Sequence, residues 1–206
     1  MLNTASEQTV YIVDDDAAVR RALQMLVKSD GLPSRSFPSA GEFLAAIDEI
    51  GPGCLLLDVC MPEMTGIELQ HELIERRFDI PTIVMTGHAD VPTAVAAMKR
   101  GAVDFIEKPF DGDELLCRTR ECLNTEQRQR EQIQRRKLAA ERLARLTPRE
   151  SQIMECLVAG RRNKQIAEDL FISARTVELH RASIMDKLEA NTLSDIVRTA
   201  LLADHF

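Results

Sequence analysis

Short apolar runs alternate with helix-period segments five times in the first half of the chain, and no other feature restricts the fold as strongly. Near-continuous apolar strands are typical of a parallel sheet that is covered by helices on both faces. The pattern therefore predicts an α/β domain with a five-stranded, doubly wound parallel sheet. The predicted strands are Val10–Val13, Ser34–Phe37, Cys54–Leu57, Thr82–Met85 and Ala102–Ile106, and the predicted helices are Ala17–Ser29, Ala40–Glu49, Thr65–Glu75, Val91–Arg100 and one that begins at Asp113.

Polar side chains follow four of these predicted strands. Asp14 and Asp15 come after the first strand, Asp58 after the third, Thr86 after the fourth and Lys108 after the fifth. The carboxyl ends of parallel strands converge on one crevice, so these residues are expected to share a pocket. Carboxylates at close range raise each other's pKa or require a cation. The pattern predicts a divalent metal site with chemistry on one aspartate.

A long segment without glycine or proline, 113–146, predicts one helix that leaves the α/β domain and continues as a connector. Its apolar positions fit an interrupted heptad seam, which leaves two interpretations open: a weak dimeric coiled coil or a solvated spacer helix.

Charge also divides the chain. Residues 1–123 hold 11 basic and 21 acidic residues, whereas residues 124–206 hold 15 and 12. The mildly basic half is the candidate for binding nucleic acid.

Four short helices are expected after Leu146. Thr147 with Glu150 forms a capping box, Asn163 is the expected cap of a helix to Leu170, and Ser173 that of a helix to Leu188. A last helix opens at Thr192. The predicted domains are 1–123, a helical linker over 124–143, and an all-α helix-turn-helix domain over 144–206.

Several classes of protein are not expected. No apolar run approaches the roughly 18 residues of a membrane span, and the polar N-terminus has no signal pattern, so a cytoplasmic protein without a membrane partner is expected. The five cysteines form no C-x-x-C pair, which argues against a zinc knuckle or a disulfide framework.

The motifs around these strand ends resemble a known family. The segments Ile12-Val13-Asp14-Asp15-Asp16, Leu57-Asp58-x-x-Met61-Pro62-x-x-x-Gly66, Met85-Thr86-Gly87 and Phe105-Ile106-Glu107-Lys108-Pro109-Phe110 resemble a bacterial two-component receiver domain. Residues 146–201 resemble the LuxR-type helix-turn-helix module. Together they resemble response regulators of the NarL/FixJ class over nearly the whole chain, and residues 86–92 are most similar to the FixJ branch.

The resemblance gives the pocket a chemistry. It implies that Asp58 accepts a phosphoryl group from the phosphohistidine of a sensor histidine kinase, and that Lys108 pairs with the phosphoryl oxygens. Mg²⁺, with Mn²⁺ as an alternative ion, prefers oxygen ligands. The implied ligands are Asp15, Asp58, Asp14 through water, and the backbone carbonyl of Cys60.

The resemblance also implies a conformational switch. The Thr86 hydroxyl is expected to bond the new phosphoryl oxygens, and its movement would let the Phe105 ring turn inward. Pro109 is cis in relatives, although the sequence allows either isomer. His88 is open to two interpretations, a neutral loop residue or a group that tunes hydrolysis of the phosphoryl group.

In the second domain, the helix after Ser173 is expected to lie in the DNA major groove. The resemblance places Glu178, Leu179 and Ala182 on its base-reading face, although many relatives carry a base in place of Glu178, so direct readout by this residue stays open. Phosphate contacts are expected from Lys164, Arg175, Thr176, Arg181 and Lys187.

These expectations describe a transcriptional regulator rather than an enzyme. The only reaction expected after phosphorylation is slow autodephosphorylation of Asp58. Phosphorylation is expected to favour a homodimer on promoter DNA, with RNA polymerase as a further partner. The dimer face is either the fourth helix (Val91, Val95, Met98) with the fifth strand, or the first helix with the long helix. One rival is a phosphatase or dehalogenase, but Cys60 stands where such an enzyme needs an acid. The other rival is a constitutive DNA-binding protein with a vestigial receiver.

Overall fold

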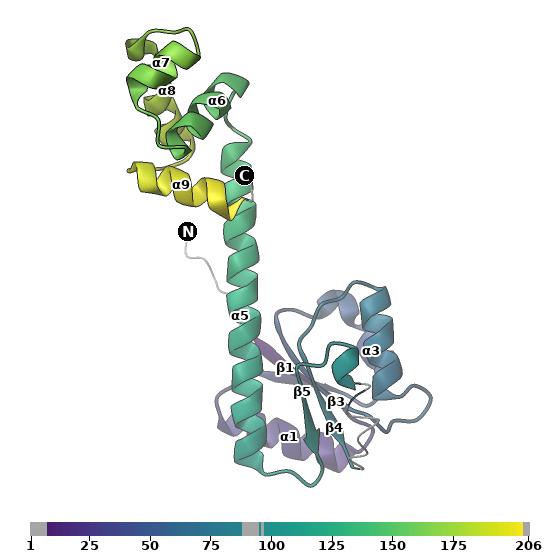
Figure 1. The fold of residues 1–206 in the computed structure, drawn as a ribbon. Helices are drawn as coiled ribbons and strands as arrows, with labels where there is room; N and C mark the ends of the chain where they lie inside the picture. Colours follow the sequence, from purple (N-terminus) through teal and green to yellow (C-terminus); the bar gives the residue numbers. More distant parts are fainter. Residues whose placement is uncertain (1–7, 88–94, 96, 204–206) are drawn as a thin grey trace. The chain divides into compact units, whose positions relative to one another are not determined.

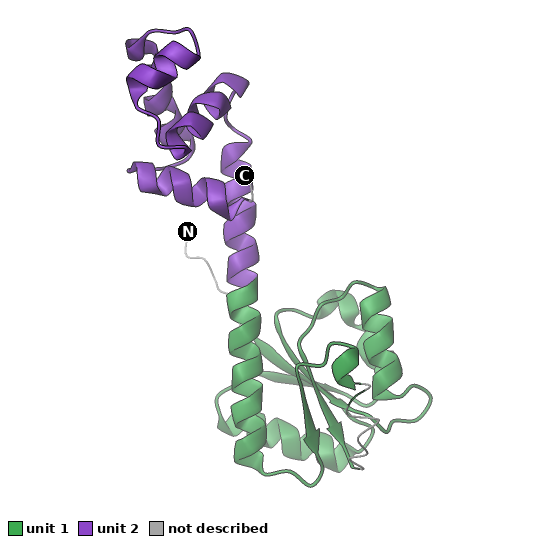
Figure 2. Ribbon diagram, in the orientation of Figure 1, with its two compact units in different colours: residues 1–129 green, residues 130–206 purple. Residues whose placement is uncertain are grey.

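The computed structural model describes residues 8–87, 95 and 97–203, which form two compact units, 1–129 and 130–206 (Figure 2). Each unit has a hydrophobic core of its own. Every helix in the described part of the chain is too short or too polar to cross a membrane.

The first unit contains the predicted five-stranded parallel sheet, in the order β2-β1-β3-β4-β5 (Figure 1). Four of the strands extend one or two residues beyond the predicted ranges, and the last of these also begins later, at Asp104 rather than Ala102. The strands are β1 (Thr9–Val13), β2 (Ser34–Phe37), β3 (Gly53–Asp58), β4 (Thr82–Thr86) and β5 (Asp104–Glu107).

Alternating strand residues enter two cores, one on each face of the sheet. Ile12 and Leu56 pack against α1 (Ala17–Ser29) and α5 (Gly112–Leu143), whereas Val13 and Leu57 pack against α2 (Ala40–Ala45) and α3 (Gly66–Glu75). Both sets are fully buried, which is why the strands are apolar at nearly every position. The doubly wound architecture predicted from the sequence is confirmed.

Two predicted helices of this unit differ in the structure. The expected helix over 40–49 ends as α2 at Ala45, and a separate 3₁₀ turn covers Ile47–Glu49. The amide of Ala46 donates to the carbonyls of both Glu42 and Phe43, so the helix tightens at this point, as helix ends commonly do. Of the expected helix over 91–100, residues 95 and 97–99 are helical, while 91–94 and 96 lie outside the described residues.

The long helix α5 ends at Leu143, three residues earlier than expected, and a turn leads on to Leu146. Its first part packs in the core of the first unit through Leu115 and Leu123. Residues 131–138 are exposed, and Ala139 is buried again within the second unit. The choice between a coiled coil and a spacer helix stays a prediction.

The second unit contains the four predicted short helices around one core: α6 (Pro148–Val158), α7 (Asn163–Asp169), α8 (Ala174–Lys187) and α9 (Leu193–Leu202). The side chains of Thr147, Ser173 and Thr192 cap α6, α8 and α9 as predicted.

The predicted cap of α7 is wrong. Arg162 occupies the N-cap position, and Asn163 is the first helical residue. The Gln165 side chain accepts a hydrogen bond from the Arg162 amide at 2.9 Å, so the chain turns into the helix one residue earlier. The Asn163 side chain instead accepts a hydrogen bond from Arg181 on α8.

Candidate functional site

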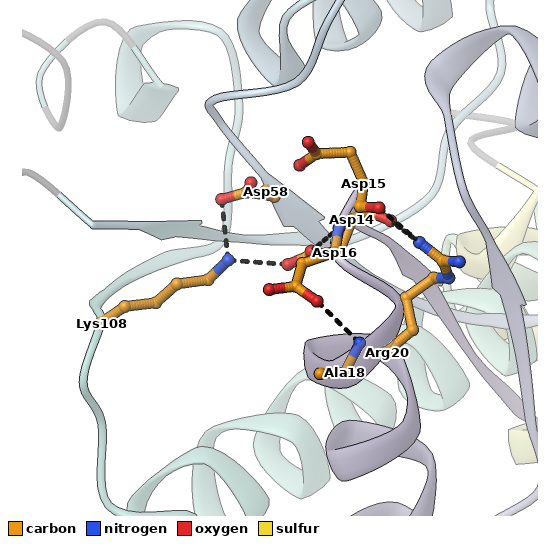
Figure 3. Close-up of polar contacts among 7 residues, drawn as sticks. All are labelled: Asp14, Asp15, Asp16, Ala18, Arg20, Asp58 and Lys108. Atoms are coloured by element: carbon orange, nitrogen blue, oxygen red, sulfur yellow. Dashed lines mark hydrogen bonds and ion pairs between the residues drawn. The ribbon is translucent and has the colours of Figure 1, made fainter.

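Three aspartates gather at the carboxyl ends of β1 and β3 (Figure 3). Asp14 follows the last residue of β1 and Asp58 is the last residue of β3, and both are almost completely buried. Asp15 is exposed. Each of the three offers a carboxylate oxygen within 4.8 Å of the others. The sheet therefore brings together acids that are more than forty residues apart in the sequence.

A glycine allows the chain beside Asp58 to pack closely. Gly66 begins α3, and its amide donates to the carbonyl of Val59 at 2.9 Å. A Cβ atom at this position would lie 2.2 Å from the Asp58 carbonyl oxygen, a distance that no side chain tolerates. The glycine eight residues after Asp58 is thus required for α3 to approach the end of β3.

Lys108 provides the positive charge of the pocket. Its Nζ atom donates to Asp14 Oδ2 at 2.7 Å and to Asp58 Oδ1 at 3.0 Å. Burial disfavours the charged amine, but these two hydrogen bonds outweigh burial and raise the pKa of Lys108. The cluster of three carboxylates and one ammonium retains two negative charges.

The electrostatics of Asp58 differ from those of a surface carboxylate. Burial raises its pKa above the ordinary value, the hydrogen bond from Lys108 opposes this, and the nearby charges of Asp14 and Asp15 add to the increase. Burial and the two neighbouring carboxylates thus destabilise the charged form of Asp58, and an added cation would offset this effect.

The loop between β1 and α1 is fixed by an arginine that the sequence analysis did not single out. Nη1 of Arg20 donates to the carbonyl of Asp14 at 2.6 Å and to that of Asp15 at 2.9 Å (Figure 3). Asp16 caps α1 by accepting from the Ala18 amide at 2.7 Å. Asp16 therefore serves the helix, while Asp14 and Asp15 face the pocket.

The other predicted pocket residues lie on neighbouring segments. Thr86 ends β4, is buried, and accepts a hydrogen bond from the Lys108 amide through its carbonyl at 2.6 Å. Phe105 is partly buried and packs in a small core with Val84. Cys60 is exposed two residues after Asp58, and the Lys108-Pro109 bond is cis. The predictions for His88 and Val91 concern residues outside the described ones.

The donor set of this pocket fits a small, hard dication. Mg²⁺ takes oxygen ligands and commonly binds through one or two carboxylates together with water and phosphate oxygens. Asp14, Asp15 and Asp58 supply such oxygens at one point. Together with Lys108 they carry a net charge of −2, which one divalent cation would neutralise. The exposure of Asp15 leaves one side of the cluster open to water.

A second candidate site lies on α8, which follows α7 after a short turn. Its buried face carries Val177 and Ile184. The opposite face follows the spacing i, i+3, i+4, i+7, which places its side chains in one row. The members of this row are all exposed: Arg175, Glu178, Leu179 and Ala182.

Three of the predicted phosphate contacts already have partners within the unit. Nη1 of Arg181 donates to Asn163 Oδ1 at 2.7 Å, and Nζ of Lys187 donates to Glu150 Oε2 at 2.6 Å. The hydroxyl of Thr176 is hydrogen-bonded to that of Ser173. Lys164 is exposed at the start of α7. Lys187 in particular faces α6 and helps to hold the two helices together.

Family models match both units of the chain. Residues 10–120 match the response regulator receiver domain, and residues 144–200 match the bacterial regulatory proteins of the luxR family. The transcriptional regulatory protein FixJ of Azorhizobium caulinodans is 47% identical over 194 residues, which cover 94% of this chain and 92% of that protein. The response regulator protein TodT of Pseudomonas putida is 44% identical over 189 residues, with coverage of 92% and 83%.

Solved structures of similar proteins extend over the whole chain. The response regulator StyR is 37% identical and superposes with a TM-score of 0.85, covering 98% of this chain and 100% of that one. Full-length FixJ from B. japonicum is 42% identical with a TM-score of 0.62 and the same coverage. The chain therefore belongs to the two-component response regulators of the NarL/FixJ class, transcriptional regulators in which a receiver domain is joined to a LuxR-type DNA-binding domain.

Proposed function

We propose that Asp58 is the phosphoacceptor of this regulator and that its phosphorylation controls binding to promoter DNA. An Asp58 carboxylate oxygen attacks the phosphorus of a kinase phosphohistidine, the P–N bond breaks, and the histidine nitrogen takes a proton. The observation that carries this proposal is the buried Asp58 carboxylate at the end of β3, 3.0 Å from Lys108 Nζ. The Lys108 ammonium pairs with the Asp58 carboxylate before the reaction and is placed to pair with the phosphoryl oxygens as they receive negative charge.

The acids around Asp58 have a supporting role. Bound Mg²⁺, or Mn²⁺, would neutralise charge on the transferring phosphoryl group. Asp15 and Asp58 would hold such an ion directly, Asp14 through water, and the backbone carbonyl of Cys60 would be a further ligand. Arg20 holds the carbonyls of Asp14 and Asp15 and so keeps both side chains directed at the pocket.

The switch is proposed to run through Thr86 and Phe105. A phosphoryl dianion on Asp58 offers new acceptors to the Thr86 hydroxyl. Phe105 is only partly buried beside its small core, and we propose that its ring turns inward when Thr86 moves. The chain at Pro109 holds Lys108 beside the pocket during this change.

Phosphorylation is proposed to favour a homodimer on paired DNA half-sites. A single small module buries only about 600–1,000 Å² on DNA, so two modules are needed for firm binding. On α9, Leu193 and Leu201 are 42% and 62% exposed and form an apolar strip with Val197, which suits a pairing surface. In the receiver, Val95 and Met98 are exposed beside β5 and are the proposed phosphorylation-dependent face, with α1 and α5 as the alternative.

The roles on DNA are proposed as follows. Glu178, Leu179 and Ala182 read base edges. The phosphate contacts come from exposed or partly exposed side chains on α7 and α8: Lys164, Arg175, Thr176, Arg181 and Lys187. The proposed domains are the receiver over 1–123, the linker over 124–143 and the DNA-binding domain over 144–206. A DNA-binding regulator acts where the promoter lies, so we place the protein in the cytoplasm, with RNA polymerase as a further partner.

The metal role of Asp15 is testable with a matched pair of variants. Asp15→Asn removes one carboxylate charge from the pocket and is expected to weaken Mg²⁺ binding by about tenfold or more. Asp16→Asn should leave Mg²⁺ affinity unchanged, because asparagine caps a helix as well as aspartate does. Calorimetric titration of both variants with MgCl₂ measures the difference. Equal affinities in the two variants would remove Asp15 from the ligand set.

Beryllofluoride, a phosphoryl mimic, tests the switch itself. With Mg²⁺ and beryllofluoride, the intact chain is expected to associate into dimers and to bind promoter DNA about tenfold more tightly or better, as a coupling of 1–3 kcal/mol implies. Analytical ultracentrifugation and fluorescence anisotropy measure the two effects, with Mg²⁺ alone as the control. A chain whose association and DNA affinity do not respond would have a vestigial receiver.

A further inference from the structure

Two helices of the second unit end with a non-glycine residue in the left-handed backbone region. Helices α1 and α6 are followed by glycines, Gly31 and Gly160, both with φ of 76°. By contrast, α7 and α8 are followed by Phe171 and Glu189, with φ of 55° and 54°. A bulky side chain at such a position is disfavoured sterically, whereas glycine is not. In both turns the backbone is held by a capping hydrogen bond, from the Ile172 amide to Ala167 and from the Ala190 amide to Met185, and the exposed Arg77 after α3 has the same conformation with φ of 55°. What distinguishes Phe171 from Glu189 is therefore the environment of the side chain.

The side chain of Glu189 has its partners within the fold. Its carboxylate is paired with the guanidinium groups of Arg142 and Arg145. Phe171 differs, because its side chain is 95% exposed. Its neighbours Leu170 and Ile172 both pack against the core of the unit, so the turn is anchored without the phenylalanine ring. A large apolar residue that is exposed to this degree and is not part of the core of its unit is expected to have its partner outside the protein.

The position of Phe171 indicates which partner this is. It lies two residues before Ser173, whose side chain caps the N-terminus of α8. In a helix-turn-helix, the N-terminal residues of the second helix contact base edges in the major groove. Arg175 and Leu179, on the exposed face of α8, begin only four residues after Phe171. The ring is thus carried at the end of α8 that enters the groove.

We propose that Phe171 is a DNA-contacting residue whose ring packs against apolar atoms at the edge of the groove, a thymine methyl group or a deoxyribose. Apolar contact with the thymine methyl group is one of the ways in which side chains distinguish bases. The proposal rests on DNA binding by this helix-turn-helix and adds a DNA-contacting residue in the turn itself. Such a contact carries no charge, so it contributes to affinity without releasing counterions.

A substitution that affects stability and DNA affinity in opposite directions tests this proposal. In the full-length chain, Phe171→Gly relieves the backbone strain and is expected to raise the Tm of the second unit by about 4 °C. The same change removes the ring and should weaken binding to DNA by about fivefold or more. The slope of log affinity against log salt should stay unchanged, because the contact involves no phosphate charge. Phe171→Tyr keeps the ring and should keep the affinity.

The probe is a duplex selected from random sequence by the wild-type chain with Mg²⁺ and beryllofluoride, and Leu179→Ala serves as the reference variant. If Leu179→Ala weakens binding while Phe171→Gly does not, the role of α8 stands and the role of Phe171 is refuted. If neither variant weakens binding, the DNA-reading assignment of α8 falls as well. If Phe171→Gly binds DNA normally but fails to activate transcription in a purified system, the ring contacts RNA polymerase, which also overturns the proposal.

Discussion

Asp58→Asn is expected to abolish the stimulation of DNA binding by phosphoryl donors. The amide is neutral and lacks the nucleophilic carboxylate oxygen, so no acyl phosphate can form. The change is isosteric, and the amide oxygen can still accept the hydrogen bond that Lys108 donates at 3.0 Å, so the fold should be retained. With acetyl phosphate and Mg²⁺, the wild-type chain should bind promoter DNA about tenfold more tightly or better, and the variant should show no gain.

An acid outside the pocket provides the control for this measurement. Asp48 is an exposed aspartate in the 3₁₀ turn after α2, and Asp48→Asn makes the same chemical change there. This control should respond to acetyl phosphate like the wild type when binding is followed by fluorescence anisotropy. Full stimulation of Asp58→Asn, equal to that of Asp48→Asn, would refute the proposed mechanism.

Glu150→Gln is expected to destabilise the DNA-binding unit by about 3 kcal/mol, in the range found when one partner of a buried ion pair is removed. The side chain of Glu150 is only 6% exposed and makes two sets of contacts. It completes the capping box of α6 with Thr147, and it accepts hydrogen bonds from Ser183 and from Lys187 on α8, both at 2.6 Å. Loss of these bonds frees α8 from α6, so weaker DNA binding should accompany the loss of stability.

The same network predicts a pH dependence. Burial alone would raise the pKa of Glu150, but hydrogen bonds from Lys187, Ser183 and Thr147 lower it from 4.5 to about 2. Because the carboxyl is more acidic in the folded unit than in the unfolded chain, its contribution to the free energy of unfolding is complete above about pH 4.5. This contribution, on the order of 3 kcal/mol, is lost as the pH falls from about 4.5 towards 2.

Calorimetric unfolding of the full-length chain checks both effects. The wild type and Glu150→Gln should differ strongly in the transition of the second unit at pH 7 and much less at pH 3. Glu168→Gln, a change at an exposed glutamate on α7, is the matched control and should leave the transition unchanged. A Glu150→Gln chain as stable as the wild type at pH 7 would show that the network contributes nothing.

Much of the receiver pocket was predictable because it depends on topology. In a parallel sheet the strand ends converge, so Asp14, Asp58 and Lys108 were expected together from their positions after apolar runs. The caps at Thr147, Ser173 and Thr192 were likewise predictable, since they depend on local residue spacing. The cap expected at Asn163 was wrong because the Arg162 amide donates a hydrogen bond to the Gln165 side chain, so the helix starts one residue earlier.

Other parts of the sites depend on tertiary contacts that spacing does not encode. Arg20 donates hydrogen bonds to the carbonyls of Asp14 and Asp15 only because the loop after β1 brings both carbonyls close to its guanidinium. The contacts of Glu150 with α8 depend on how α8 crosses α6, which brings Ser183 and Lys187 within hydrogen-bond distance of its carboxylate. The strained backbone of Phe171 is a property of the turn and has no signature in residue type.

The most direct test of the account is to locate the phosphoryl group. The purified chain is incubated with acetyl phosphate and Mg²⁺, and the modified peptide is mapped by mass spectrometry, with EDTA in a parallel sample. We predict one phosphoryl group per chain, on Asp58, and none when the metal is removed. Phosphorylation at another residue, sustained turnover without a phosphorylated chain, or no modification in the presence of Mg²⁺ would contradict the account.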